Sequence, residues 1–170
     1  MIRGKVWTFG DNINTDLMVP SEVTYASPEA QARAVFQANR PGWVNEVQRG
    51  DVLIGGRNFG MGSSRPAARS LKNVGLSCML AESLNGLFFR NAVNFGFVAM
   101  ECPGIHELFA EGQVAQVDID NWLVTNEQTG TSLPITPIPV ELRSLMMEGG
   151  VFSLLEKLGL IEPGKAKAKQ

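Results

Sequence analysis

The sequence predicts an α/β fold, because short apolar segments alternate with helical segments in the middle of the chain. Residues 52–55 form an apolar run, residues 67–74 have a helical pattern that Gly75 ends, and residues 77–81 form a second apolar run. Such runs are typical of strands buried on both faces, and glycine commonly ends a helix. The order of strand, glycine-rich loop, helix and strand is that of a βαβ unit.

The same order occurs a second time. Residues 84–95 show a helical pattern with a strongly apolar face, and Gly96 ends it before the apolar run at residues 97–100. Nearer the N-terminus, residues 5–9 alternate like a strand, and residues 28–39 are rich in alanine and glutamine, which indicates a helix. The chain up to residue 100 is therefore predicted to consist of strands joined by helices.

The rest of the chain is predicted to have smaller elements. In order, these are a short helical turn at residues 108–112, paired strands at 113–119 and 122–125, an extended edge segment at 133–139, and helices at 141–148 and 151–158. Residues 1–160 are expected to form one domain, because 170 residues with 44% hydrophobic content suit one compact core. Residues 161–170 carry lysines without a core pattern and are expected to form a flexible tail.

Charge and hydropathy exclude several classes of partner. The net charge is −2 and the sequence pI is about 5.5, so the chain lacks the basic field that nucleic-acid binding requires. The apolar runs end well before the roughly 20 residues that a membrane helix needs, and the first residues do not form a signal-peptide pattern. We therefore expect a cytoplasmic protein with no nucleic acid and no membrane among its partners.

The cysteine and histidine content argues against a metal site in this chain. The two cysteines, Cys78 and Cys102, lie among apolar residues and form no CxxC pair, so they are predicted to be buried thiols. An iron-sulfur cluster needs three or four thiolates. The single histidine, His106, has no G-x-S-x-G motif beside it that would indicate a hydrolase triad. We expect no metal ligands in the chain.

The loop at residues 58–66 has the composition of an anion site. It combines two glycines with Ser63, Ser64 and Arg65, directly after the first predicted strand of the βαβ unit. Glycine lets the backbone approach a ligand closely, a helix beginning near Pro66 would direct free N–H groups at it, and an arginine fork suits a carboxylate or phosphate. An ordinary glycine turn with a serine cap is the alternative interpretation.

Three motifs in this order resemble one known family. They are GDNINTD at residues 10–16, NFGMGSSR at 58–65 and AESLNGLFFRNAVNFG at 81–96. Together they are similar to the small subunits of 3-isopropylmalate dehydratase, the free-standing swivel domain of the aconitase superfamily. The resemblance covers roughly residues 1 to 160. It implies a three-layer β/β/α swivel domain and a hydro-lyase that is active only with a large subunit, which carries the 4Fe-4S cluster. No cofactor is then expected on this chain alone.

The resemblance also implies roles for particular residues. Ser63 matches the serine whose alkoxide is the catalytic base, and Arg65 would clamp a substrate carboxylate. The other residues implied in substrate binding are Ser64, Gly62, Asp16 and Thr15, with Asn14 in support. Asp16 has a turn or capping role as its alternative. The loop departs from the family pattern at Met61 and Pro66, where cysteine and glutamate are familiar.

The loop after Pro20 is where relatives select the substrate side chain. Relatives that act on an extra carboxylate tend to have an arginine there, whereas this loop has Glu22, Val23 and Tyr25. Glu22 would repel a third carboxylate, and the other two could line an apolar pocket. We therefore favour a 2-alkylmalate such as isopropylmalate or a methylated malate. The alternatives are a homoaconitase-type substrate and a noncatalytic anion-binding module.

Two predictions concern side chains near the proposed site. Arg69, one helical turn after Arg65, is expected to be a solvated helix charge, and an extension of the positive surface toward a ligand is the alternative. Four large apolar residues are expected either to pack in the core or to form a surface that a partner covers. These are Phe59, Met61, Phe88 and Phe89.

Overall fold

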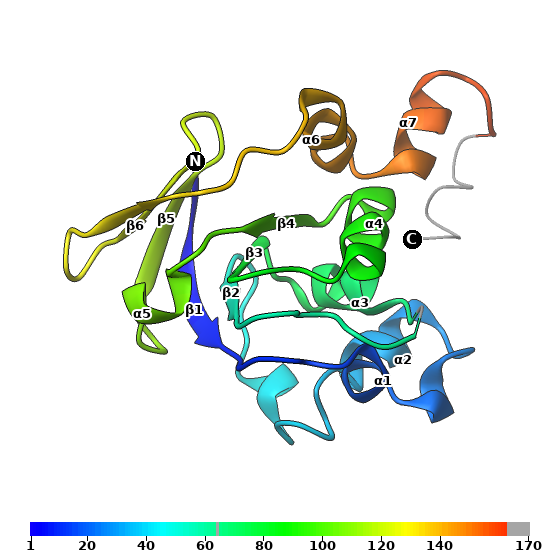
Figure 1. Ribbon diagram of the computed structural model, residues 1–170. Coiled ribbons are helices and arrows are strands. Elements are labelled where there is room, and N and C mark those ends of the chain that lie inside the picture. The colour runs from blue at the N-terminus through cyan, green and yellow to red at the C-terminus, as the bar shows by residue number, and fades with distance from the viewer. Residues whose placement is uncertain (64, 163–170) are drawn as a thin grey trace.

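The computed structural model describes residues 1–63 and 65–162, and its centre is one mixed sheet of seven strands (Figure 1). The strands lie in the order β4-β3-β2-β1-β5-β6-β7. In chain order they are β1 (Ile2–Thr8), β2 (Val52–Gly55), β3 (Cys78–Ala81), β4 (Val98–Glu101), β5 (Val114–Asp118), β6 (Leu123–Asn126) and β7 (Ser132–Pro134). Strands β1 to β4 are parallel, and β5 to β7 pair antiparallel.

Strand β1 belongs to both halves of the sheet. Residues 2–5 pair with β5, whereas residues 6–8 pair with β2. Where the partner changes, the backbone at Gly50 packs closely against Gly4. Glycine is needed there, because a Cβ on Gly4 would lie 2.1 Å from the carbonyl oxygen of Gly50. The antiparallel half therefore folds over one face of the parallel half, as Figure 1 shows for β5 and β6.

Most of the helices lie on the other face of the parallel strands, but α5 (Ile105–Leu108) packs into the core beneath the antiparallel strands. The remaining helices are α1 (Thr15–Met18), α2 (Pro28–Arg33), α3 (Ala67–Val74), α4 (Gly86–Phe95), α6 (Val140–Met147) and α7 (Val151–Lys157), and there are short 3-10 turns at Ser21–Val23 and Trp43–Asn45. Helices α3 and α4 are the crossover connections of the two βαβ units, and they pack on each other beside the sheet (Figure 1). Both units predicted from the sequence are confirmed.

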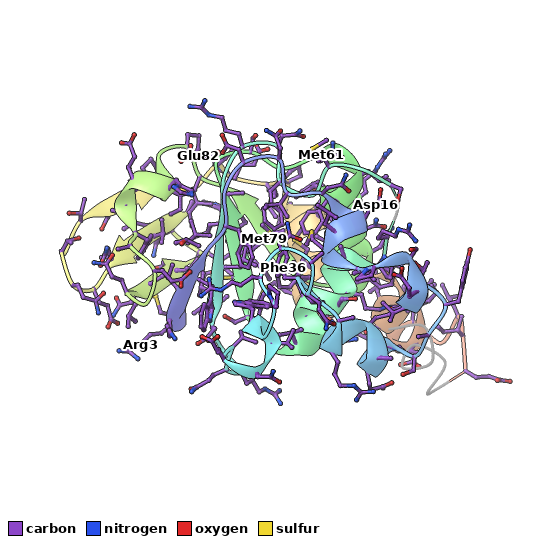
Figure 2. The ribbon with its side chains drawn as sticks, turned by 90° about the horizontal axis from the view of Figure 1, so that it is seen from below. Arg3, Asp16, Phe36, Met61, Met79 and Glu82 are labelled. Carbon is purple, nitrogen blue, oxygen red and sulfur yellow. The ribbon has the colours of Figure 1, made fainter. Side chains whose placement is uncertain are left out.

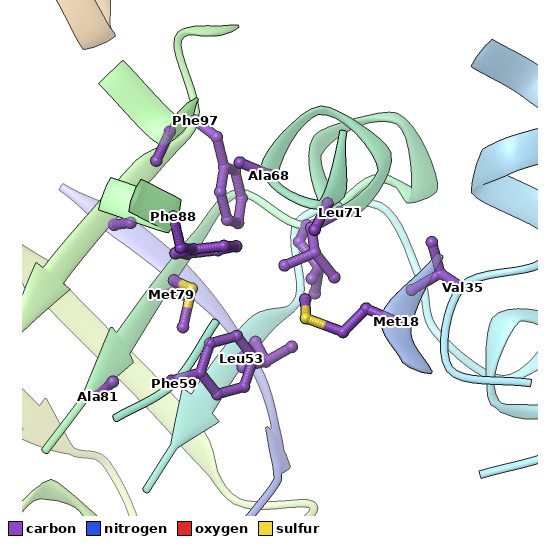
Figure 3. Packing of buried hydrophobic residues seen from close by; sticks show 14 of the residues in the cluster. Met18, Val35, Leu53, Phe59, Ala68, Leu71, Met79, Ala81, Phe88 and Phe97 are labelled. Carbon is purple, nitrogen blue, oxygen red and sulfur yellow. The ribbon is translucent and has the colours of Figure 1, made fainter. Parts of the chain in front are cut away.

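Two hydrophobic cores lie on opposite faces of the parallel strands. Leu53, Met79 and Ala99 face the helices, as Figure 3 shows for the first two. Ile54 and Leu80 point the other way, into the core beneath the antiparallel strands. Because side chains alternate along a strand, burial on both faces requires apolar residues at successive positions. This arrangement of helices, parallel strands and antiparallel strands is the three-layer β/β/α architecture that the resemblance implies.

The helix expected at residues 28–39 is shorter in the structure. Helix α2 ends at Arg33, and Phe36 takes a left-handed backbone conformation with φ of 57°. Its ring is fully buried, stacks on Phe9 with centroids 4.0 Å apart, and contacts Trp43 edge to face. Burial of this aromatic cluster therefore outweighs the local helical preference of the segment.

The helical turn expected at residues 108–112 was also placed wrongly. Helix α5 covers Ile105–Leu108, and Phe109 is already extended. Gly104 begins the helix with φ of 86°, and both Ile105 and Phe109 are buried in the core between the two halves of the sheet. Of the extended segment predicted at 133–139, only the beginning forms a strand, β7, and the N–H groups of Ile135 and Thr136 donate to the carbonyls of Trp122 and Glu101.

The two cysteines are buried, as predicted. Burial raises the pKa of the Cys78 thiol to about 12 and that of Cys102 to about 11, so both stay protonated at neutral pH. At the C-terminal end, α7 ends at Lys157. Most of the predicted flexible tail, residues 163–170, lies outside the described residues, and the division into a domain at 1–160 and a tail at 161–170 stays a prediction.

Candidate functional site

The candidate site lies where three loops leave the carboxyl ends of β1, β2 and β3. The loop after β2 lies between the other two, because the Gly60 and Met61 N–H groups both donate to the Ile13 carbonyl at 2.9 and 3.1 Å. On its other side, the Phe59 N–H donates to the Ser83 carbonyl at 3.0 Å. The carboxyl edge of a parallel sheet is the usual position for a ligand site in an α/β protein. Figure 2 shows Asp16 and Met61 at this edge, away from Arg3.

The two glycines of the central loop are required by close packing. Gly60 and Gly62 have φ values of 82° and 97°, in the left-handed region that favours glycine. A Cβ on Gly60 would lie 2.3 Å from the Phe88 ring, and a Cβ on Gly62 would lie 2.2 Å from Asn14 Oδ1. The glycines therefore let neighbouring protein groups approach the loop. Their proposed use in approaching a ligand stays a prediction.

Thr15 anchors the central loop through its side-chain hydroxyl. Its side chain is 2% exposed, and its hydroxyl contacts the carbonyl oxygens of Met61 at 3.1 Å and Ser63 at 2.7 Å. Asn14 caps the short helix α1 by accepting the Asp16 N–H at 2.8 Å. Thr15 thus fixes the backbone of Ser63, which is a supporting role, and Asn14 orients the turn that presents Asp16.

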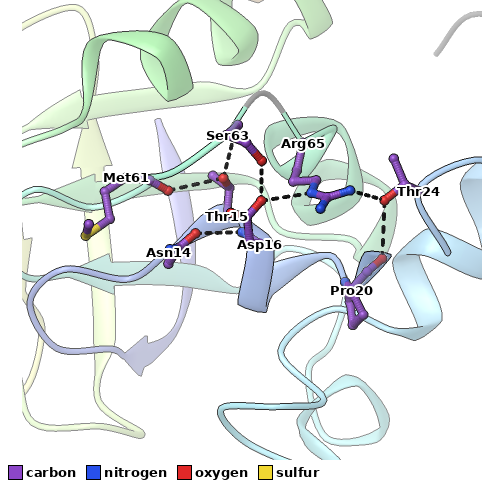
Figure 4. Close-up of polar contacts among 8 residues, drawn as sticks. All are labelled: Asn14, Thr15, Asp16, Pro20, Thr24, Met61, Ser63 and Arg65. Carbon is purple, nitrogen blue, oxygen red and sulfur yellow. Dashed lines mark hydrogen bonds and ion pairs between the residues drawn. The ribbon is translucent and has the colours of Figure 1, made fainter. Parts of the chain in front are cut away.

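Asp16 brings Ser63 and Arg65 together (Figure 4). The Ser63 hydroxyl donates to Asp16 Oδ1, and Arg65 Nε donates to the same oxygen at 2.8 Å. Arg65 Nη1 also donates to the Thr24 hydroxyl. The Asp16 and Arg65 side chains are 40% and 23% exposed, and Ser63 is exposed. The site therefore combines an accessible hydroxyl, a carboxylate and a guanidinium at the N-terminal side of α3.

These contacts determine the charge state of Asp16. The Ser63 hydroxyl and then the Arg65 guanidinium hold the pKa of Asp16 below its ordinary value, so the carboxylate is ionised at neutral pH. Arg65 has five N–H groups, and the contacts with Asp16 and Thr24 use two of them. The terminal nitrogens are therefore the part of Arg65 that suits a second carboxylate.

The structure places the other predicted substrate-binding residues differently. Val23 is half-buried and packs against the main core, whereas the Tyr25 side chain is 99% exposed. Neither residue lines the pocket beside Arg65, so their role in an apolar substrate pocket stays a prediction. Ser64 lies outside the described residues. The pocket itself is lined by Thr24, Arg65, Pro66, Arg69, Asn91 and Phe95.

Two residues of this region were not singled out from the sequence, and one was interpreted wrongly. Thr24 contacts Arg65, and Gln31, which is 1% exposed, hydrogen bonds to both Thr24 and Arg69. Arg69 is half-buried in these contacts, so it is not a solvated helix charge. The sequence feature that could have indicated these contacts is the glutamine on the alanine-rich face of α2, because a polar residue at a core position needs a buried partner.

The aromatic residues near the site belong mainly to the core. Phe59 and Phe88 are buried, and their rings meet edge to face with centroids 5.6 Å apart. Phe89 is partly buried against the same cluster. Met61 is half-buried, and the Asn58 side-chain amide donates to its sulfur at 3.7 Å. The prediction of core packing is confirmed for Phe59 and Phe88.

Within residues 1–63 and 65–162, no group of three or more histidine, cysteine, aspartate or glutamate side chains could hold a metal ion. In the same part of the chain, every helix is too short or too polar to cross a membrane.

Comparisons with known proteins agree with this fold. The family described as the aconitase C-terminal domain matches residues 10–105. The chain is 37% identical to "3-isopropylmalate dehydratase small subunit 1" of Methanopyrus kandleri, over 94% of this chain and 95% of the relative. It is 38% identical to "isopropylmalate/citramalate isomerase small subunit" of Methanocaldococcus jannaschii, over 92% and 95%.

A solved structure gives the same result. The crystal structure of a 3-isopropylmalate dehydratase from Methanocaldococcus jannaschii superposes with a TM-score of 0.86 at 26% identity, and the match covers 96% of this chain and 98% of that chain. Since both the sequence and the fold match along nearly the whole length, the chain belongs to the family of 3-isopropylmalate dehydratase small subunits, which share the aconitase C-terminal domain.

Proposed function

We propose that the chain is the small subunit of a heteromeric hydro-lyase that isomerises a 2-alkylmalate by dehydration and rehydration, with 3-isopropylmalate as the substrate. The observation that carries this proposal is the contact of Ser63 and Arg65 with one Asp16 oxygen, at the edge of the sheet where three loops meet. The relatives with matching names and lengths support it. We further propose that the protein works in the cytoplasm.

The chemistry requires a base next to a bound carboxylate. Removal of a proton from the carbon beside a carboxylate leaves negative charge that a cation and N–H donors stabilise. Ser63 is exposed and lies two residues before Arg65, so one guanidinium can bind the carboxylate and also favour the ionised form of the hydroxyl. Asp16 opposes that ionisation, and it fixes the direction of the Ser63 hydroxyl and of Arg65 Nε. Ser63 is thus proposed as the base and Arg65 as the carboxylate clamp.

A large-subunit partner supplies the rest of the site in this proposal. The described residues do not fit a 4Fe-4S cluster, because Cys78 and Cys102 are both buried and no set of three metal-binding side chains gathers elsewhere among them. We therefore place the cluster in the large subunit. The exposed Tyr25 and the half-buried Val23 lie on the loop that Thr24 joins to Arg65, where a docked partner would enclose them around an alkyl group.

A methylated malate is the second candidate substrate. The Methanocaldococcus jannaschii relative is named for both isopropylmalate and citramalate. Both compounds carry an alkyl group and two carboxylates, so Arg65 and the absence of an arginine in residues 21–27 suit either one.

The test is an anaerobic assay of the small subunit with its large subunit and reconstituted cluster, comparing isopropylmalate, citramalate, homocitrate and citrate. We expect turnover of the alkylmalates alone, and a loss of at least about 100-fold in kcat for Ser63→Ala, the scale of a missing general base. Arg65→Lys should raise KM, because an ammonium cannot form the paired contact with a carboxylate. Exposed residues supply the controls, Ser132→Ala and Arg90→Lys.

Each alternative predicts a different result. Turnover of tricarboxylates alone would refute the substrate assignment, and full activity of Ser63→Ala would refute the assigned base. Phosphate binding by the small subunit without any turnover in the complex would favour a noncatalytic anion-binding module.

A further inference from the structure

Gln31 is a buried polar residue whose two ends are both hydrogen bonded. It lies on α2 and is 1% exposed. Its Nε2 donates to the Thr24 carbonyl at 2.7 Å, and its Oε1 accepts from Arg69 Nη2 at 2.7 Å. An unpaired amide at this depth would be costly, so the contacts on both sides determine how the side chain lies.

Arg69 determines which end of the amide faces Thr24. A guanidinium only donates hydrogen bonds, so the group that it meets must be the amide oxygen. The amide nitrogen is then directed toward the Thr24 carbonyl, which can only accept. Arg69 is itself positioned by α4, because its guanidinium lies over the Phe95 ring at 5.3 Å from the centroid.

Thr24 connects this pair to the candidate site. Its carbonyl accepts from Gln31, while its hydroxyl accepts from Arg65 Nη1 and contacts the Pro20 carbonyl at 3.4 Å. The same arginine donates through Nε to Asp16. A continuous series of hydrogen bonds thus runs from α3 through α2 and the loop at residues 20–27 back to Arg65.

We propose that Gln31 and Arg69 are positioning residues for substrate binding, and that they act through Thr24 to orient Arg65 toward a substrate carboxylate. This inference rests on the proposed function of Arg65. Arg69 also lines the pocket beside Arg65, but in the proposal the substrate carboxylate is bound by Arg65 alone. Their effect is to hold the loop that presents the Thr24 hydroxyl, so that the free edge of the guanidinium keeps one direction.

The first test replaces the amide of Gln31 with a carboxylate. Gln31→Glu keeps an oxygen for Arg69 but places a second oxygen against the Thr24 carbonyl, which repels it. Loss of the hydrogen bond to the Thr24 carbonyl is expected to raise KM for the alkylmalate about 10-fold and to change kcat less than twofold, because substrate binding is weakened throughout the reaction. Gln37→Glu is the matched control, because it introduces the same charge at an exposed position.

A double-mutant cycle tests whether the effect passes through Thr24. Thr24→Val removes the hydroxyl that contacts Arg65 but leaves the backbone carbonyl in place. In that background, Gln31→Met should change KM less than twofold, whereas in the wild-type background it should raise KM about 10-fold. Equal effects of Gln31→Met in both backgrounds would overturn the proposal. Arg69→Lys should show a smaller increase in KM than Arg69→Met, because lysine retains a donor for the amide oxygen.

Hydrogen exchange gives a measure that does not depend on activity. In the purified small subunit, the amides of residues 21–27 should exchange faster in Gln31→Glu than in wild type or Gln37→Glu. Unchanged exchange would overturn the proposed role of Gln31, whether or not the complex turns over a malate. Absence of turnover in the wild-type complex would instead refute the proposed function. Faster exchange with an unchanged KM in an active complex would also overturn the proposed role of Gln31, because the loop would then be ordered for stability alone.

Discussion

The ion pair between Arg40 and Glu111 should make folding stability depend on pH in a defined window. Glu111 accepts from Arg40 Nη1 at 2.7 Å and from Nη2 at 2.8 Å, and it also accepts the Thr8 N–H at 3.2 Å. The Arg40 contact, opposed by partial burial, lowers the pKa of Glu111 from 4.5 to about 2. Because the pKa is depressed in the folded state, the stabilisation is fully present above about pH 4.5 and is lost as the pH falls toward about 2.

The magnitude follows from this difference in pKa and from the exposure of the pair. The difference alone corresponds to about 3 kcal/mol at neutral pH. The Glu111 side chain is 34% exposed and that of Arg40 is 33% exposed, so solvent screening reduces the expected contribution to about 1–2 kcal/mol. Glu111→Gln should therefore lower the free energy of unfolding by about 1–2 kcal/mol at pH 7.

Urea unfolding of wild type and Glu111→Gln at pH 7 and pH 3 measures this contribution. The difference between the two proteins should shrink to less than half at pH 3. Glu107→Gln, at an exposed position, is the control and should change stability little at either pH. A difference at pH 7 that persists unchanged at pH 3 would refute the reasoning, because an ion pair of a titrating carboxylate cannot be independent of its protonation.

Three further predictions concern the site and the core. Gly62→Ala should destabilise the fold by about 1–3 kcal/mol in thermal unfolding, since the added Cβ meets Asn14 Oδ1 at a positive φ, and an unchanged midpoint would contradict that packing. Asp16→Asn should lower kcat at least about tenfold with a smaller change in KM, because the ionised acceptor that orients the Ser63 hydroxyl is lost, and steady-state kinetics of the complex would show it. Both cysteines should resist a thiol reagent at pH 7 until the protein unfolds, as their raised pKa values and burial require, and rapid labelling of the native chain would contradict this.

Elements whose signals are local could be predicted from the sequence. Helix α3 has the predicted bounds, Ala67–Val74, because Pro66 precedes its first turn and Gly75 ends it in a left-handed conformation. The parallel strands β2 and β3 were recognisable because they are apolar on both faces. Phe36 shows the limit of this reasoning, since its left-handed conformation depends on rings that are distant in the chain.

The candidate site also has contacts that could be predicted from the sequence and contacts that could not. The contacts of Ser63 and Arg65 with Asp16 join two motifs that the sequence had already indicated, so their proximity could be anticipated from the order of the motifs. The role of Thr24 could not, because it depends on a backbone carbonyl that meets Gln31, and backbone groups have no residue-specific signal. Polar residues at core positions of a helix are the one sequence feature that points to such contacts.

The first loop supports the site in two separate ways. Thr15 is buried and holds the Ser63 backbone, whereas the neighbouring Asp16 is accessible and holds the side chains of Ser63 and Arg65. Removal of the Thr15 hydroxyl should therefore displace the loop, while neutralisation of Asp16 should leave the loop in place and release the side chains. Thr15→Val should lower both stability and activity, and Asp16→Asn should lower activity with little change in stability. Adjacent positions in one motif thus have separable effects, because one side chain faces the protein and the other faces the site.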